Sequence, residues 1–113
     1  MIDYWHNPRC SKSREGLALL ESKGADLRVR RYLEDVPTRA ELAAAWEALG
    51  KPPVETMMRT KDAAFREAGL AGKDDAALLD AMAANPALIE RPLAISGTRA
   101  VIGRPPERLL DLL

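Results

Sequence analysis

The chain of 113 residues is 47% hydrophobic and 30% charged, which is enough to bury one ordinary core and too little for two. Its 17 Lys and Arg balance 17 Asp and Glu, so net charge offers no general attraction to nucleic acid or to an anionic membrane. Because the N-terminus lacks a signal-peptide pattern and no stretch reaches the roughly 18 to 20 apolar residues of a membrane span, we expect a cytoplasmic protein without a membrane partner. A single cysteine, Cys10, excludes an internal disulfide, and with the single histidine, His6, it leaves no usual zinc site.

The first third of the chain is predicted to form a strand, a helix and a second strand. Residues 2–5 are apolar and partly aromatic, and the His-Asn-Pro segment that follows favours a loop. From Ser11 the apolar residues follow the helical period until Gly24, which suits a C-terminal cap. A second strand is expected from Leu27 to between residues 31 and 33, although three arginines disturb its alternation.

The middle of the chain is predicted to be helical. Thr38 and Glu41 have the spacing of a capping box, in which each side chain accepts a hydrogen bond from the other residue's backbone N–H. The expected helices span residues 38–49, 54–68 with a possible break near residues 60–62, and 74–84.

Two short strands and a helix close the chain. The strands are expected at residues 93–96 and 99–102, with a tight turn at Gly97, and the helix begins at Pro105 or Pro106. A βαβ unit followed by a ββα unit is the thioredoxin arrangement, with a right-handed, parallel first crossover. The sequence thus predicts a single α/β, thioredoxin-like domain over residues 1–113, with a small mixed four-stranded sheet and a helical insertion at about residues 38–85.

The only cysteine is predicted to lie at the start of the first helix. Unpaired N–H groups and the positive end of the helix dipole favour a thiolate there, and they also favour an oxyanion. A lone cysteine is often a buried, inert residue, but polar neighbours favour a reactive thiol at Cys10. His6 could be catalytic or a structural hydrogen-bonding residue. The candidate oxyanion-binding residues beside Cys10 are Ser11, Lys12, Ser13 and Arg14, with Arg9 as a further nearby charge.

The residues around Cys10 resemble the active-site loop of the glutaredoxin-coupled arsenate reductases, a family of the thioredoxin-like superfamily; they read HNPRCSKSR at positions 6–14. Four further motifs fall where that family has counterparts: Leu33-Glu34 with Pro37, Met57-Met58-Arg59, Ile89-Glu90-Arg91-Pro92 and Gly103-Arg104-Pro105-Pro106-Glu107. The resemblance therefore covers nearly the full chain.

The resemblance implies that Cys10 is the nucleophile and that three arginines hold the oxyanion and the covalent intermediate. By motif these are Arg59, Arg91 and Arg104; the neighbouring Arg66 and Arg99 lack the motif context.

The resemblance also implies supporting roles for His6, Asn7 and Pro92. Pro92 matches the position of a cis proline in thioredoxin-like proteins, and cis forms account for only about 5 to 6% of X-Pro bonds in folded proteins. Such a bond would bring Arg91 toward Cys10.

The function implied by the resemblance is the reduction of arsenate, or a similar oxyanion, to arsenite in arsenic detoxification. Glutathione would be the co-substrate and glutaredoxin the protein partner, with no bound cofactor and no metal. An external thiol is required because the chain has no second cysteine for an internal disulfide.

Two other functions stay open at this stage. One is a glutathione-dependent thiol transferase that uses Cys10 on an organic disulfide, which would need a glutathione groove in place of three converging arginines. The other is a non-enzymatic redox or transcription regulator of the same superfamily. Such regulators typically pair two cysteines two residues apart, whereas position 13 of this chain is serine.

Overall fold

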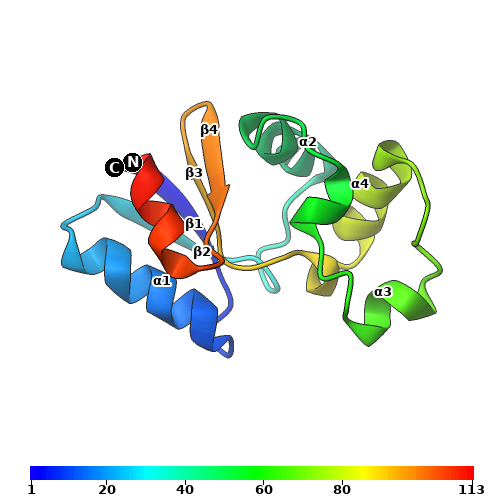
Figure 1. Ribbon diagram of the computed structural model, residues 1–113, viewed down its shortest axis with the longest axis horizontal. Helices are drawn as coiled ribbons and strands as arrows, with labels where there is room; N and C mark the ends of the chain where they lie inside the picture. The colour runs from blue at the N-terminus through cyan, green and yellow to red at the C-terminus, as the bar shows by residue number, and fades with distance from the viewer.

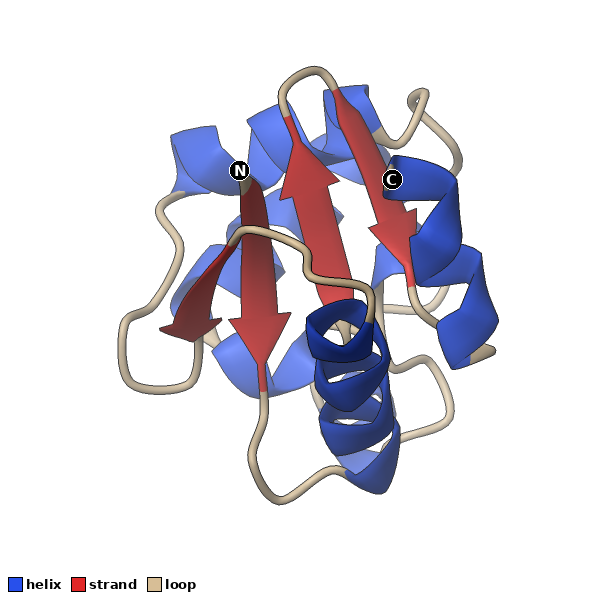
Figure 2. Ribbon diagram, turned by 90° about the vertical axis from the view of Figure 1, so that its left-hand side faces the viewer, coloured by secondary structure: helices blue, strands red, loops and turns tan.

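The computed structural model describes residues 1–113 and contains one four-stranded sheet. Its strands are β1 (Ile2–His6), β2 (Leu27–Arg31), β3 (Leu93–Ser96) and β4 (Arg99–Ile102). Figure 2 shows them side by side in the order β2-β1-β3-β4, with β2 parallel to β1 and both other pairs antiparallel. The predicted mixed sheet is confirmed, and β1 is one residue longer than expected.

Helices cover both faces of the sheet (Figure 1). None of them is long and apolar enough to cross a membrane. The α-helices are α1 (Ser11–Ser22), α2 (Arg39–Ala48), α3 (Ala63–Glu67) and α4 (Asp75–Ala84), and the 3-10 helices are η1 (Val54–Met57), η2 (Pro86–Leu88) and η3 (Pro106–Leu112).

Alternation along the strands separates two apolar clusters, because successive side chains point to opposite faces. Tyr4 of β1 belongs to the cluster formed with α1 and η3, which also includes Leu20 and Leu109. Trp5, the next residue, belongs to the larger cluster formed with the helices between β2 and β3. We call those helices and their connections, residues 38–88, the helical segment.

The helical segment differs from the sequence prediction at one point. The helical stretch expected over residues 54–68, with a possible break near residues 60–62, is divided in two: the 3-10 helix η1 ends at Met57, and Met58 has extended dihedrals and forms a β-bridge with Ile89. Helix α3 begins later, where the Asp62 side chain accepts a hydrogen bond from the Ala64 N–H at 3.0 Å. Long-range pairing of Met58 therefore overrides the local helical pattern. The capping box at Thr38 and Glu41 is confirmed.

The helix at the C-terminus also differs in kind from the one expected. It begins at Pro106 as predicted, but it is the 3-10 helix η3. Its placement depends on Gly103, because a Cβ there would lie 2.8 Å from both Pro92 and Leu109. Gly16 of α1 is equally confined, since a Cβ at that position would lie 2.6 Å from Tyr4 Oη and 2.7 Å from Leu109. These two glycines let α1, η3 and the segment before β3 pack closely.

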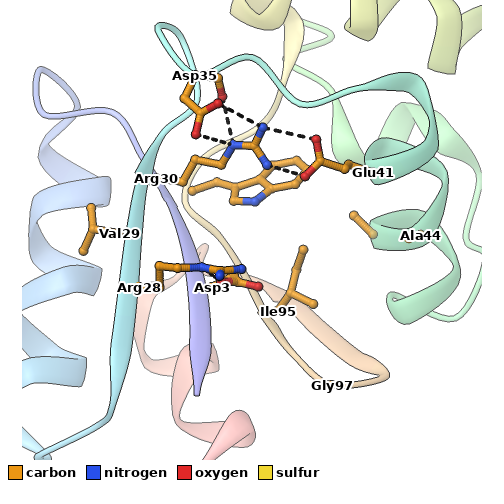
Figure 3. Close-up of a pocket in the computed structure, with 11 residues that line it drawn as sticks. Asp3, Arg28, Val29, Arg30, Asp35, Glu41, Ala44, Ile95 and Gly97 are labelled. Atoms are coloured by element: carbon orange, nitrogen blue, oxygen red, sulfur yellow. Dashed lines mark hydrogen bonds and ion pairs between the residues drawn. The ribbon is translucent and has the colours of Figure 1, made fainter.

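An ion-pair network joins β2 to the helical segment (Figure 3). The Arg30 guanidinium donates to both carboxylate oxygens of Glu41, to Asp35, and to the Val36 carbonyl, and it lies 6.0 Å from the centre of the Trp5 ring. A cavity of about 470 Å³ lies beside this network. Because the guanidinium already donates to partners within the protein, the network holds the sheet and α2 together and offers little to a ligand.

Candidate active site

Cys10 is the N-cap residue of α1. Its backbone is extended, with φ −93° and ψ 122°, and its carbonyl accepts the first intrahelical hydrogen bond from Arg14 N–H at 3.0 Å. The loop before it is held by Asn7, whose carbonyl accepts from Cys10 N–H and whose side-chain Oδ1 accepts from Arg9 N–H, both at 3.0 Å. The Cys10 side chain makes no capping hydrogen bond, and the backbone N–H groups of Lys12 and Ser13 in the first turn of α1 lie close enough to the sulfur to stabilise its thiolate.

The surroundings of Cys10 favour the thiolate. Burial by itself raises the pKa of the Cys10 thiol, but the backbone N–H groups of Ser13 and Lys12 and the positive charge of Arg91 outweigh it, so the pKa is lower than usual. Cys10 is partly accessible to solvent. The position therefore combines an activated sulfur with access for a substrate.

Ser13 organises the loop from inside the protein. Its side chain is fully buried, and its Oγ lies 2.7 Å from His6 Nδ1 and accepts a hydrogen bond from the Asn7 N–H at 3.0 Å. Tyr4 Oη donates to the Ser13 carbonyl at 2.6 Å. The Ser13 hydroxyl, expected at the oxyanion, is thus committed to His6 and Asn7, and the residue faces Cys10 through its backbone.

His6 has the surroundings of a structural hydrogen-bonding residue. Burial lowers the pKa of His6, and the charges of Arg31 and Arg14 lower it further, so the neutral imidazole is favoured. A neutral His6 can accept the Ser13 hydroxyl proton at Nδ1. The alternative in which His6 adds positive charge to the site is therefore disfavoured.

The remaining loop residues lie at the surface. Arg14 donates to the Pro8 carbonyl at 2.9 Å, and Lys12 pairs with Glu15 at 3.4 Å along the helix. Ser11 is exposed at the first position of α1. Of the four residues predicted to bind an oxyanion, only Ser11 has a side chain without a partner in the protein.

The three arginines singled out by motif line one cavity of about 400 Å³. The cavity has no apolar lining residue; it is formed by Arg59, Thr60, Lys61, Asp62, Glu90, Arg91 and Arg104. The two alternative arginines lie elsewhere: Arg66 donates to the Lys61 carbonyl and Arg99 to the Asp111 carbonyl.

Backbone pairing brings the arginines together from distant parts of the chain. Arg59 N–H donates to the Leu88 carbonyl at 2.8 Å, and Glu90 N–H donates to the Met57 carbonyl at 2.7 Å, on either side of the Met58 bridge. Arg104 Nη1 donates to the Arg91 carbonyl at 3.0 Å. The bond between Arg91 and Pro92 is cis, as expected, and the bond between Arg104 and Pro105 is also cis, which no sequence pattern predicted.

Two carboxylates in the cavity were missed from the sequence. Asp62 pairs with Arg59 at 3.0 Å, and Glu90 pairs with Arg91 at 3.1 Å and more loosely with Arg104 at 3.8 Å. Glu90 stands directly before Arg91 in one of the motifs, and Asp62 has the i,i+3 spacing from Arg59 of a helical ion pair, so both signals were present.

Arg91 connects the cavity with the cysteine. It lines the cavity, its charge lowers the pKa of Cys10, and its side chain is only 16% exposed. Its Nε is the one buried side-chain nitrogen or oxygen without a hydrogen-bond partner. No group of three or more His, Cys, Asp or Glu side chains is placed to hold a metal ion.

The fold and this site define a thioredoxin-like protein with one cysteine at a helix N-terminus and an arginine-lined cavity, which Arg91 connects. The chain belongs to the ArsC family, whose model matches residues 5–112. It is 46% identical to the arsenate reductase of Haemophilus influenzae over 111 residues, which cover 96% of each chain. It is 40% identical to an uncharacterized protein of Escherichia coli over 99% of this chain and 96% of the relative. The structure of an arsenate reductase from Vibrio cholerae aligns with a TM-score of 0.94 and 45% identity, covering 99% of this chain and 97% of that one.

Proposed function

We propose that this protein is an arsenate reductase that uses Cys10 as its nucleophile and glutathione with glutaredoxin as the source of electrons. The observation that carries the proposal is the unpartnered, buried Arg91 Nε in an arginine-lined cavity beside a thiol of lowered pKa. A buried donor without a partner is costly, and an oxyanion or a thiolate would satisfy it. The names of relatives more than 40% identical to this chain support arsenate as that oxyanion.

Arsenate would bind between the N-terminus of α1 and the three arginines. Each guanidinium offers several N–H donors in one plane, which suits a tetrahedral oxyanion with several negative oxygens. Arg59, Arg91 and Arg104 all line the cavity, and the first-turn N–H groups of α1, which stabilise the Cys10 thiolate, are further donors on the cysteine side. These groups would hold the anion with its arsenic facing the sulfur.

In the first step, the Cys10 thiolate attacks the arsenic. A sulfur–arsenic bond forms, one oxygen leaves as water after taking up protons, and arsenic stays in the pentavalent state. The three arginines would stabilise the charge on the remaining oxygens.

Reduction then needs two external thiols, because the chain has only one cysteine. The glutathione sulfur attacks the arsenic and displaces a second oxygen as water. A glutaredoxin thiolate takes the glutathione sulfur as a mixed disulfide, and the electron pair of the broken sulfur–arsenic bond stays on arsenic, which becomes trivalent. Water releases arsenite from Cys10. The proposal needs no bound cofactor and suits the reducing cytoplasm.

The lining of the cavity favours this function over a thiol transferase. A glutathione groove needs surfaces for a whole tripeptide, whereas this cavity has charged and polar lining residues and none that is apolar. The paired-cysteine switch of a redox regulator has no counterpart, since position 13 is serine and its hydroxyl is held by His6 and Asn7.

The proposal is tested by following NADPH consumption in a mixture of the protein with arsenate, glutathione, glutaredoxin and glutathione reductase. We expect arsenate-dependent turnover, which the Cys10→Ser variant abolishes. Absence of turnover while Cys10 is verified as reduced would contradict the proposed activity. If the protein removes glutathione from a mixed disulfide but shows no activity with arsenate, the thiol transferase is favoured.

A further inference from the structure

The carboxylate of Glu90 has one oxygen in use and one free. Its Oε1 accepts from the Arg91 backbone N–H at 3.2 Å and from Arg91 Nη1 at 3.1 Å, and it lies 3.8 Å from Arg104 Nη1. Its Oε2 makes no hydrogen bond in the protein. Because Oε2 is not a buried atom, solvent or a ligand can reach it. The Glu90 side chain is 22% exposed and lines the arginine cavity. Oε2 is therefore an unused acceptor on a residue that lines both the arginine cavity and the neighbouring groove formed with Thr56 and Arg108.

In the other carboxylate of the cavity, both oxygens have a partner in the protein. Asp62 Oδ2 pairs with Arg59 Nη2 at 3.0 Å, and Asp62 Oδ1 accepts from the Ala64 N–H at 3.0 Å as the cap of α3. The two acidic residues thus balance charge in the same cavity, but only Glu90 keeps an acceptor oxygen that is unused.

A free carboxylate oxygen in an anion site selects among anions. An ionised carboxylate can accept hydrogen bonds and cannot donate them. An oxyanion whose oxygens all lack protons cannot donate either, so it would leave Oε2 unpaired and would place two negative oxygens against each other. An oxyanion that retains a hydroxyl can donate that proton to Oε2. Sites built to pair with a ligand hydroxyl discriminate strongly against analogues that lack it.

We infer that Glu90 is a specificity-determining residue that accepts a hydrogen bond from a hydroxyl of the bound oxyanion. The cavity then takes tetrahedral oxyanions that keep a proton near neutral pH, such as arsenate and phosphate. It rejects sulfate and selenate, which are fully deprotonated under those conditions. This inference rests on the proposed function, because it assumes that the oxyanion binds in this cavity next to Cys10.

The test measures how well an anion protects Cys10 from alkylation by iodoacetamide. Phosphate and sulfate are compared at a mildly alkaline pH, where phosphate is almost entirely the hydrogen phosphate dianion, so the two anions match in charge and shape and differ by one proton. We expect the wild-type protein to need about tenfold more sulfate than phosphate for half protection, the factor typical of one unpaired hydrogen bond to a charged group. Arsenate and selenate form a second matched pair and should show the same order. Equal protection by phosphate and sulfate in the wild type would overturn the inference.

The Glu90→Gln variant removes the charge and supplies an amide N–H₂ that can donate to any oxygen of the anion. We expect the ratio of sulfate to phosphate concentrations to fall toward one, mainly through better sulfate binding. Asp62→Asn is the matched control, since it removes the same charge from the same cavity. It should strengthen the binding of both anions similarly and leave the ratio of their concentrations near the wild-type value. The inference fails if Glu90→Gln leaves the ratio unchanged. That result would mean that the free oxygen faces the neighbouring groove, which Glu90 lines together with Thr56 and Arg108. It also fails if both variants change the ratio equally.

The outcomes separate this inference from the proposed function. If arsenate and phosphate both leave the alkylation of Cys10 unprotected, the oxyanion site itself is wrong, and the role of Glu90 falls with it. If all four anions protect Cys10 equally, the oxyanion site stands and only the role of Glu90 is overturned. The comparison of anions on the wild-type protein needs no variant, so it holds even if Glu90→Gln folds poorly.

Discussion

Arg104 donates a hydrogen bond from Nη1 to the backbone carbonyl of Arg91 at 3.0 Å. This contact connects the segment after β4 to the segment before β3. It holds the Arg104 side chain against the backbone of a second cationic residue, Arg91. The Glu90 carboxylate lies between the same two arginines. The positions of the two guanidinium groups are therefore coupled.

The Arg104→Ala variant should lower kcat/KM for arsenate by about 10- to 100-fold, since it removes a charged hydrogen-bond donor from the cavity. Arg99→Ala is the matched control, because Arg99 donates to the Asp111 carbonyl outside the cavity; its effect should stay below about threefold. Steady-state kinetics in the coupled NADPH assay measure both. Similar losses in the two variants would show that Arg104 has no special part in the site.

The Arg91→Ala variant should raise the apparent pKa of Cys10, because the Arg91 charge stabilises the thiolate. The pKa is measured as the midpoint of the iodoacetamide alkylation rate against pH. Arg59→Ala removes a positive charge from the same cavity, but Arg59 is not among the main causes of the lowered Cys10 pKa, so it should shift the midpoint less. Equal midpoints for wild type and Arg91→Ala would refute the link between Arg91 and the thiol.

The Ser13→Ala variant should destabilise the protein by about 1 to 3 kcal/mol, since it leaves His6 Nδ1 and the Asn7 N–H without their partner. Ser11→Ala, at an exposed position two residues earlier, should change the free energy of unfolding by less than about 0.5 kcal/mol. Urea denaturation gives both values. A Ser13→Ala protein as stable as Ser11→Ala would mean that the His6 network does not hold the loop.

The ion pair between Glu41 and Arg30 should make stability depend on acid. The hydrogen bonds from Arg30 lower the pKa of Glu41 to about 2 from its usual value of 4.5. Because the folded-state pKa is the lower one, the stabilisation is complete above pH 4.5 and is lost as the pH falls toward 2. The difference in melting temperature between wild type and Glu41→Gln should be constant above pH 4.5 and shrink below it. A difference independent of pH over this range would exclude the ion pair as its source.

Much of the fold follows from local pattern. The apolar strand before the Asn-Pro loop, the helical period after Ser11 and the capping box at Thr38 each reflect contacts within a few residues, and each element forms as predicted. Arg30 was treated as a disturbance of β2, whereas its partner Glu41 lies in another element and the pair joins the two. A pattern confined to one element cannot reveal such a partner.

The candidate site was predictable only in part. The position of Cys10 at a helix start follows from the sequence around it, but the gathering of Arg59, Arg91 and Arg104 came from the family motifs alone. Their proximity depends on the bridge between Met58 and Ile89, which pairs segments far apart in the sequence. The same bridge interrupts, at Met58, the helical stretch that local periodicity predicted over residues 54–68 with a possible break near residues 60–62.

The Met58 bridge joins two parts of the chain that supply different residues of the site. The start of α1 supplies the thiol and the segment before β3 supplies Arg91, whereas Arg59 and Asp62 come from the helical segment. A chain with the helical segment shortened could retain the nucleophile and still lose one wall of the anion cavity. Reactivity and anion recognition are thus separable properties that could diverge independently among proteins with this sheet, and the backbone hydrogen bonds around residues 57–59 help to bring them together in this one.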